Sequence, residues 1–429
     1  MKRFPLYTPF LLASAALAAT PARPNIVLIL ADDLGWKDVG YQGSKYMETP
    51  NIDRLAREGM VFTAGYAAAG NCAPSRACLL SGNYTPRHGV YAVGSTDRGS
   101  RNEQRLIPIP NKSGLAKENI TMADALKAAG YVTGIFGKWH LRGVDGATPE
   151  EQGFDVVYQS ASGWSKDEAG NPKGIYSLTQ AAGEFMEKNQ DRPFFLYLPH
   201  YAIHSDLEAR KASLEKFQRK RRGRQDPDPL YAACTYDLDD GVGLLLKKLA
   251  DLGLDQNTLV VFTSDNGATQ HSSQEPLRGS KGGYYEGGIR EPWIVRWPKV
   301  TPPGSRCDVP VINVDLYPTF LDVAGVPAPA GKSLDGENIL PLLSGGALKR
   351  PSIFWYFPGY LDSPVIRGRD LDVRTGFRSR PVSVIHRGDW KLHLFHEEWV
   401  LDGGWGSIAT NHAVELYNLK SDIGERHDL

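Results

Sequence analysis

The chain has 429 residues, of which 41% are hydrophobic and 23% charged, a composition that excludes a disordered or fibrous protein and allows a large core. Lysine plus arginine and aspartate plus glutamate both total 49, so the formal net charge is zero. This balance argues against nucleic acid and against a bulk membrane surface as partners. An anionic ligand would therefore need a local basic pocket.

The N-terminus has the features of a targeting segment. A short basic region, Met1 to Arg3, precedes an apolar stretch from Pro9 to Ala18, and Ala16-Leu17-Ala18 fits an A-x-A cleavage site. We predict a signal peptide over residues 1–18 and export to the periplasm or the medium; the alternative is a disordered apolar start. The stretch is too short to span a bilayer, and we expect no transmembrane segment elsewhere.

Apolar runs typical of buried parallel strands alternate with helical patterns over much of the chain. The predicted helices cover residues 122–129 and 230–252, each followed by a glycine that stops it. The predicted strands cover residues 25–31, 132–136, 193–198, 259–263 and 293–297. This alternation predicts an α/β fold with a doubly wound, mostly parallel sheet flanked by helices.

The pattern changes after a Pro/Gly-rich stretch at residues 326–336. Short aromatic-rich runs follow, at residues 353–357, 382–386, 390–395 and 415–418. Such runs are typical of antiparallel strands. We predict an α/β catalytic domain over residues 22–349 and a smaller C-terminal α+β domain with an antiparallel sheet over residues 350–429.

A very basic segment, Lys211 to Arg224, ends in KFQRKRRGR. The ordinary interpretation is a solvated helix and loop. The alternative is a rim that attracts a polyanionic substrate.

Acidic and amide side chains follow two of the predicted strands. Asp32 and Asp33 come after the first strand, and Asp265 and Asn266 follow the strand at 259–263. The carboxyl edge of an open α/β sheet is where ligands bind, and two acidic clusters there repel each other unless a cation lies between them. Their oxygens suit Ca²⁺ or Mg²⁺. The alternative is that these residues cap the helices that follow.

The stretch GNCAPSRACLLSG at residues 70–82 contains one of only 4 cysteines. Pro74 suits the first turn of a helix, which places Cys72 just before the helix N-terminus, where an anion is favoured. Arg76 adds a fixed cation that can make bidentate contacts with an oxyanion. Cys72 is therefore predicted to lie where a tetrahedral oxyanion ester would be held.

Cys72-Ala73-Pro74-Ser75-Arg76, followed by Leu80 and Gly82, resembles the C-x-P-S-R-x-x-x-L-x-G signature of the formylglycine-dependent sulfatases, members of the alkaline-phosphatase-like superfamily. Further stretches resemble the same family in the same order and cover nearly the whole mature chain: residues 24–33, 130–140, 264–267, Lys281 with 287–290, and 415–419. The ordered set is far more specific than one short signature.

The resemblance implies that Cys72 is a precursor. In this family a formylglycine-generating or sulfatase-maturing enzyme, which reads the proline and arginine of the signature, oxidises the cysteine to formylglycine. One hydroxyl of the hydrated aldehyde attacks the sulfur of a sulfate ester, and the alcohol leaves. Deprotonation of the second hydroxyl then re-forms the carbonyl and expels sulfate. A serine sulfate has no second hydroxyl on the same carbon, so it could lose sulfate only if water attacked the sulfur.

The family roles carry over to matching positions. Asp32, Asp33, Asp265 and Asn266 resemble the metal ligands, with the modified Cys72 completing a site for one cation, usually Ca²⁺ in bacterial members, with Mg²⁺ as an alternative. The other roles fall on a set of cationic side chains. Arg76 would fix the formylglycine hydroxyl, Lys138 and Lys281 would hold sulfate oxygens, His140 would assist sulfate release, and His204 would contact sulfate or protonate the leaving alcohol.

Each of these residues also has an ordinary interpretation. Without their context, Lys138 and Lys281 would be solvated lysines and His204 a surface or core hydrogen-bonding residue. Arg290 fits a structural ion pair and is left out of the site. Cys78 is expected to pack in the core, although pairing with unmodified Cys72 is an alternative. If Cys72 is modified, an odd number of cysteines remains, and at least one stays a free thiol.

Two positions depart from the family pattern. A serine that contacts the site in some relatives has no clear counterpart near residues 160–165. The sequence also ends at Leu429, where many relatives continue into a last helix.

Three functions remain in competition. The first is a bacterial exported sulfatase that acts on a sulfated carbohydrate substrate, favoured by the predicted export and the basic segment. The second is a phosphomonoester or phosphonate hydrolase of the same superfamily, disfavoured because Lys138, His140 and Lys281 stand where a second metal's ligands would be. The third is a non-catalytic protein that binds sulfated glycans through an unmodified Cys72.

Overall fold

The computed structural model describes residues 23–159, 170–362 and 376–429. The predicted signal peptide and the region near residues 160–165 lie outside the described residues. All the candidate site residues named above lie within them. Within the described ranges, no helix combines the length and apolar character needed to cross a membrane.

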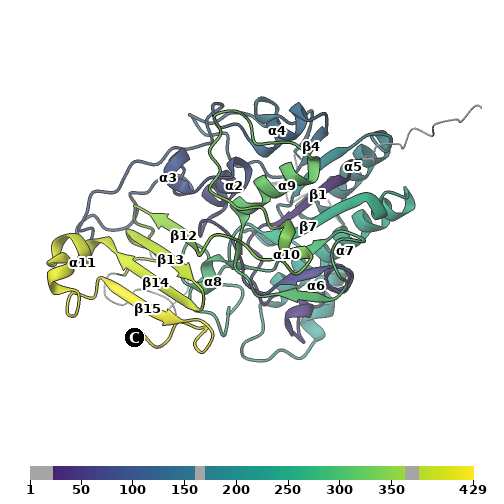
Figure 1. Cartoon of the computed structure of the whole chain (residues 1–429). Coiled ribbons are helices and arrows are strands. Elements are labelled where there is room, and N and C mark those ends of the chain that lie inside the picture. The colour runs from purple at the N-terminus through teal and green to yellow at the C-terminus, as the bar shows by residue number, and fades with distance from the viewer. Residues whose placement is uncertain (1–22, 160–169, 363–375) are drawn as a thin grey trace, which may run out of the picture.

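Among the described residues, eight strands form one large sheet in the order β10-β2-β9-β7-β1-β6-β4-β5 (Figure 1). Its strands are β1 (Asn25–Ala31), β2 (Met60–Phe62), β4 (Val132–Phe136), β5 (Val156–Tyr158), β6 (Phe194–Pro199), β7 (Thr258–Ser264), β9 (Ile294–Arg296) and β10 (Ser305–Cys307). Only β9 runs antiparallel to its neighbours, β2 and β7. The predicted doubly wound, mostly parallel sheet is confirmed.

Helices cover both faces of this sheet, because alternate side chains of each buried strand point to opposite sides. Ile26, Leu28 and Leu30 pack in a core with residues of α2 (Cys72–Ser81), α4 (Met122–Ala128) and α9 (Leu316–Ala324). Val27 and Ile29 pack in a second core with residues of α1 (Pro50–Glu58), α5 (Ile175–Lys188) and α7 (Pro229–Asp251). The predicted helices and strands agree with these elements to within about two residues at each end.

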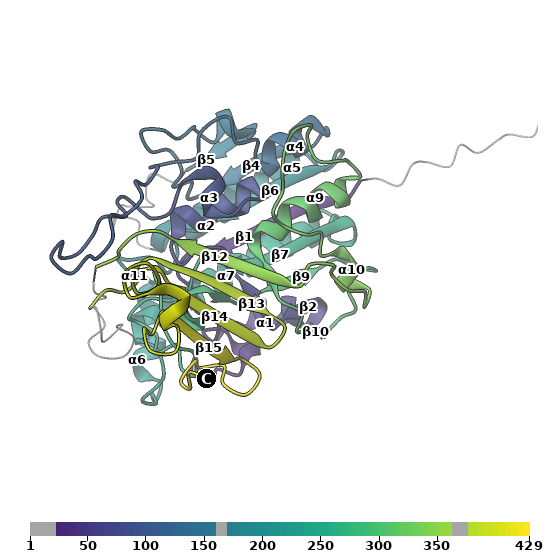
Figure 2. The same ribbon diagram turned by 60° about the vertical axis from the view of Figure 1, so that its left-hand side comes forward.

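The C-terminal part forms a four-stranded antiparallel sheet, which lies to one side of the large sheet in Figure 1 and faces the viewer in Figure 2. Its strands are β12 (Ser352–Phe357), β13 (Val382–Arg387), β14 (Trp390–Phe395) and β15 (Val414–Asn418), and α11 (His396–Leu401) follows β14. A separate three-stranded sheet has the order β11 (Val311–Ile312), β3 (Gly65–Tyr66) and β8 (Arg290–Glu291). Short helices complete the chain: α3 (Thr85–His88), α6 (Lys211–Arg219), α8 (Glu286–Ile289) and α10 (Leu340–Leu343).

A third apolar core joins the four-stranded sheet to the rest of the chain. Ile353, Trp355 and Phe357 of β12 pack in one cluster with Tyr66 of β3 and Cys78 of α2. The helix that begins at Cys72 is therefore held between the main core and the C-terminal sheet. The domain boundary at residues 349–350 stays a prediction.

Candidate active site

The carboxyl ends of β1 and β7 bring the two acidic pairs together. The strands are parallel neighbours with Ala31 opposite Ser264, so the residues that follow each strand emerge at the same sheet edge. The Asn266 side chain donates a 2.7 Å hydrogen bond to Oδ1 of Asp33, and the backbone N–H of Asp33 donates to Oδ1 of Asp265 at 3.2 Å. All four side chains of this group are fully buried: Asp32, Asp33, Asp265 and Asn266.

This group has the donor set of a cation site. Ligand atoms of Asp32, Asp33, Cys72 and Asp265 all lie within 4.8 Å of one another. Two further oxygens, Oδ1 of Asp32 and Oδ1 of Asn266, are buried without a hydrogen-bond partner. Burial and the neighbouring Asp32 raise the pKa of Asp265 to about 6, as expected for crowded carboxylates. Hard oxygen ligands with unused lone pairs fit Ca²⁺ or Mg²⁺.

The alternative role as helix caps fails on the geometry. Among the described residues, no α-helix begins directly after either acidic pair; the next α-helices begin at Pro50 and Glu286. Asp33 instead adopts a left-handed backbone conformation, with φ of 66°, which is uncommon for a residue other than glycine. Such conformations concentrate at functional sites.

Cys72 is the first residue of α2 and lies at the edge of the carboxylate group. Its Sγ is 4.0 Å from Oδ1 of Asp33, and the residue is 1% exposed. The sequence predicted Cys72 one position before the helix, a difference within the ordinary uncertainty of helix ends. Burial raises the pKa of its thiol to about 12, so an unmodified Cys72 is protonated at neutral pH.

Arg76 lies one turn further along α2, and its guanidinium group contacts two of the carboxylates. Its Nε and Nη2 donate to Oδ2 of Asp265 at 2.9 and 2.7 Å, and Nη1 donates to the carbonyl of Lys138 at 2.9 Å. Nη2 also lies 3.5 Å from Asp32. Arg76 therefore neutralises two carboxylates and fixes the backbone that carries Lys138.

Two lysines face the same carboxylates from other segments. Nζ of Lys138, just after β4, donates to Asp32 at 2.5 Å, and Nζ of Lys281 donates to Asp33 at 2.7 Å. Burial alone would raise the pKa of Asp32, but Lys138 and Arg76 outweigh it and hold that pKa well below its ordinary value. Three cations thus balance three carboxylates, and a bound divalent ion would leave the site positive and attractive to an anion.

The loop that carries Lys281 is held against the loop after β7. The backbone N–H of Lys281 donates to the carbonyl of Ala268, and Gly267 touches Gly287 so closely that a Cβ there would lie 1.9 Å from the Gly287 oxygen. Only glycine fits at this approach. This packing sets the position of the Lys281 ammonium group relative to Asp33.

Two histidines border the group. His140 follows Lys138 on the loop after β4 and has φ of 62°. Burial, together with Lys138 and Arg76, lowers the pKa of His140 to about 3, so its ring is neutral at pH 7. A ring nitrogen of His204 lies within 4.8 Å of the ligand atoms of Asp32 and Cys72, and burial lowers its pKa as well.

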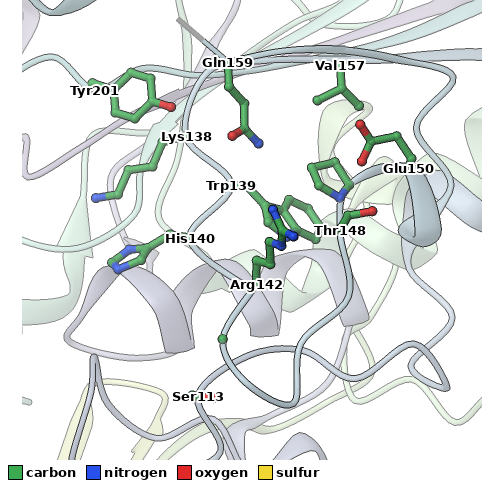
Figure 3. A pocket seen from close by; sticks show the side chains of 12 residues that line it. Ser113, Lys138, Trp139, His140, Arg142, Thr148, Glu150, Val157, Gln159 and Tyr201 are labelled. Atoms are coloured by element: carbon green, nitrogen blue, oxygen red, sulfur yellow. The ribbon is translucent and has the colours of Figure 1, made fainter. Parts of the chain in front are cut away.

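Beside Lys138 and His140 the surface opens into a cavity of about 670 Å³ (Figure 3). Tyr201 also lines it. The sequence analysis missed this cavity, although Tyr201 belongs to the stretch that carries His204. Three exposed polar residues also line the cavity: Arg142, Glu150 and Gln159. No motif or spacing in the sequence singles them out.

A sequence model of the family described as Sulfatase matches residues 24–326. The chain belongs to the sulfatase family. A second model, described as N-sulphoglucosamine sulphohydrolase, C-terminal, matches residues 280–374.

Similar proteins cover almost the whole chain. A protein named Sulfatase from Formosa agariphila is 33% identical over 99% of this chain and 87% of its own. Human Arylsulfatase A is 34% identical over 98% of this chain and 86% of its own. A solved structure, Ps i-CgsB in complex with k-i-k-neocarrahexaose, has a TM-score of 0.74 and 29% identity, covering 95% of this chain and 88% of that one.

Sulfatases are sulfuric ester hydrolases, and this chain hydrolyses sulfate esters. The predictions of family, enzyme class and alkaline-phosphatase-like fold are confirmed. Formylglycine and a divalent metal are general to the family.

The remaining sequence expectations concern the other cysteines and the basic segment. All four cysteines are free, and Cys78 packs in the core with its Sγ 3.4 Å from Nε2 of His88. The basic segment forms α6 and the loop after it. Lys216 and Lys220 pair with Glu48, so part of its charge is neutralised locally. Its proposed attraction for a polyanion stays a prediction.

Proposed function

We propose that this sulfatase acts outside the cytoplasm on sulfated carbohydrates, through a formylglycine made from Cys72 and one bound Ca²⁺, or alternatively Mg²⁺. The observation that carries the proposal is the position of Cys72. It lies at the N-terminus of a buried helix, among three carboxylates, with Arg76, Lys138 and Lys281 around them. The names of the similar proteins support a sulfated sugar as substrate, since one was solved with a neocarrahexaose.

The cation would be held by a set of oxygen ligands at the sheet edge: Asp32, Asp33, Asp265 and Asn266. When bound, it would make a ligating hydroxyl more acidic and offset charge on the sulfate. The two buried oxygens without hydrogen-bond partners, on Asp32 and Asn266, support this assignment. Arg76 would keep the carboxylates of Asp32 and Asp265 ionised and in place.

Formylglycine, when present, would supply one hydroxyl as the nucleophile toward sulfur and a second whose deprotonation releases sulfate. Cys72 itself, with its raised thiol pKa, does not supply a thiolate at neutral pH. We assign to His140 the acceptance of the proton that is lost when sulfate is released, because its ring is neutral and its buried Nδ1 has no hydrogen-bond partner in the described structure.

Lys138 and Lys281 would hold the sulfate oxygens. Each ammonium group contacts a carboxylate and is also accessible to a ligand. The Lys281 side chain is 16% exposed, and Lys138 lines the cavity. Fixed cations at these positions stabilise charge that develops on the transferring group. His204 would protonate the departing alcohol oxygen or contact the sulfate.

Export, modification and domain organisation complete the proposal. The signal peptide over residues 1–18 would direct the chain to the periplasm or the medium, and a formylglycine-generating or sulfatase-maturing enzyme would act on Cys72. Residues 22–349 would form the catalytic domain and residues 350–429 the smaller C-terminal domain.

The test combines the chemical state of residue 72 with substrate choice. Trypsin cleavage after Arg57 and Arg76 yields a peptide that contains Cys72, and its mass distinguishes a thiol from an aldehyde. Protein made with a maturing enzyme should carry the aldehyde and hydrolyse 4-nitrophenyl sulfate much faster than 4-nitrophenyl phosphate. Faster phosphate hydrolysis would favour a phosphomonoester or phosphonate hydrolase. A persistent thiol with glycan binding and no turnover would favour the binding protein.

A further inference from the structure

The cavity beside Lys138 and His140 contains a cation that the sulfate chemistry does not use. Arg142 lines this cavity and is exposed, and no hydrogen bond or ion pair joins it to another side chain within the described ranges. Glu151, outside the lining, has a pKa lowered first by the backbone N–H of Thr148 and to a smaller extent by the charge of Arg142. Figure 3 shows its side chain between the Lys138–His140 side of the cavity and the side formed by Thr148 and Glu150. An unpaired guanidinium group in a concave site is suited to bind a carboxylate or a sulfate in bidentate fashion.

We propose that this cavity is the subsite for the sugar that carries the scissile sulfate, and that Arg142 selects sugars bearing a second anionic group. The inference rests on the proposed function. It names a substrate class, a sulfated sugar with a carboxylate or further sulfate on the same or the adjoining ring. Two residues of chain span at most about 7 Å, so the backbone of Arg142 is close to that of His140, and one short ligand can meet both.

The other walls of the cavity suit a carbohydrate. Trp139 borders it as a largely buried ring, 4% exposed, that is fixed because its Nε1 donates to the carbonyl of Ala147 at 2.9 Å. Glu150 and Gln159 are exposed on the lining, where they can accept and donate hydrogen bonds to hydroxyl groups. An apolar face with a few polar groups placed around it is typical of a small-ligand site, and the volume of about 670 Å³ lies within the usual range.

The carboxylate of Glu150 sets a limit on the charge that this subsite accepts. Arg142 and Glu150 line the same cavity as two exposed side chains of opposite charge, and within the described residues no ion pair joins them. A substituent that reaches Arg142 gains a charge-assisted contact, whereas one placed at Glu150 meets like charge. The subsite therefore distinguishes where the second anionic group is attached, and a fully sulfated ring should be a poorer substrate than a ring with one extra anion.

The test compares matched sugar sulfates. The panel pairs N-acetylgalactosamine 6-sulfate with the chondroitin 6-sulfate disaccharide, which adds a carboxylate on the adjoining ring. It also pairs galactose 4-sulfate with the ι-carrageenan disaccharide, which adds a second sulfate. The wild-type enzyme, with an aldehyde verified at residue 72, should prefer a substrate that bears a second anionic group. Its kcat/KM should be at least tenfold higher for the best such substrate than for the matched sugar with the scissile sulfate alone. Arg142→Ala should reduce this ratio to near one, and Arg142→Lys should retain part of it.

The matched control is Arg387→Ala, which removes an exposed arginine at the end of β13 and should leave the ratio unchanged. The proposal is overturned if the wild type shows no such preference, or if Arg142→Ala keeps it. Loss of all turnover in the Arg142→Ala variant, with an unchanged melting temperature, would also overturn it, because Arg142 would then act on the sulfate chemistry itself.

A second measurement separates the subsite from the proposed function. If the wild type hydrolyses neither 4-nitrophenyl sulfate nor any member of the panel, the proposed function fails. Calorimetric binding of the same disaccharides then decides the subsite: affinity that falls at least tenfold in Arg142→Ala supports it, and unchanged or absent binding overturns it.

Discussion

Nζ of Lys138 donates to Oδ2 of Asp32 over 2.5 Å, and the two side chains are 4% and 0% exposed. The lysine follows β4 and the aspartate follows β1, two strands that β6 separates in the sheet. This ammonium group therefore connects the carboxylate group with the cavity that Lys138 also lines.

Lys138→Ala should lower kcat/KM for 4-nitrophenyl sulfate by about 10²–10³-fold, the usual cost of removing one preorganised donor to a developing oxyanion. Steady-state kinetics on matured protein measure this loss. Lys127→Ala is a matched control, because Lys127 is 47% exposed and pairs with Asp155 at the surface. An unaltered kcat/KM in Lys138→Ala would remove this residue from the sulfate site.

Removal of divalent ions with a chelator should abolish turnover and lower the melting temperature, and added Ca²⁺ should restore both. A ligand present at 100 times its Kd stabilises the folded state by about 2.7 kcal/mol, which is large enough to detect. Asp33→Asn should weaken this calcium-dependent shift. Scanning calorimetry with and without Ca²⁺ gives the result, and a melting temperature indifferent to chelation in the wild type would contradict a cation at the sheet edge.

His88 should make the protein sensitive to acid. Burial lowers the pKa of His88 to about 3, and Lys332 adds to the effect. Below about pH 6.5 the unfolded chain binds a proton that the folded chain does not, so stability is present above this pH and is lost as pH falls toward 3. The loss from this one residue is about 2–3 kcal/mol between pH 7 and 4.5, at 1.36 kcal/mol per pKa unit.

His88→Asn should flatten this part of the stability profile, since its Oδ1 can accept the hydrogen bond that Nδ1 of His88 accepts from Val90. Urea unfolding at pH 7 and 4.5 measures the difference. His427→Gln, at a side chain 83% exposed, should leave the profile as in the wild type. An identical pH slope in His88→Asn and wild type would refute the assignment.

Lys391 should be a major stabilising residue at the junction with the C-terminal sheet. Its Nζ lies 2.9 Å from Glu286 and 3.0 Å from Glu425, and all three side chains are 0% exposed. Lys391→Met removes the cation shared by two buried carboxylates, which keep only Arg290 and His393, respectively, as basic partners within the described residues, and should cost about 3–5 kcal/mol of unfolding free energy. Arg105→Ala, which removes a 40% exposed partner of Asp402, should cost less than about 1 kcal/mol in the same urea titration. Similar costs for the two variants would contradict this difference.

Much of the fold was predictable because buried strands carry a strong local pattern. The run at residues 25–31 is apolar throughout, and β1 has these bounds with every residue buried. The strand at 293–297 was predicted as well, but its antiparallel direction was not, because direction depends on pairing with β2 and β7 across long loops. Apolar patterns report burial and not the partner strand.

In the candidate site, too, some residues were predictable from a local pattern and others depend on tertiary packing. Asp32 and Asp265 were predictable because each follows a strand, and parallel neighbours end at one sheet edge. The ion pairs of Arg76 and Lys138 with these carboxylates depend on tertiary packing, and so does the cavity around Arg142. The Gly267–Gly287 contact that positions the Lys281 loop has no local pattern at all.

Every residue of α2, from Cys72 to Ser81, is buried, and the helix is enclosed by two cores. The maturing enzyme proposed above would therefore reach Cys72, Pro74 and Arg76 only while this stretch is still unfolded. On that proposal, oxidation of Cys72 competes in time with folding of the newly made chain. A molecule that folded first would keep a buried thiol at residue 72 and would lack the nucleophile.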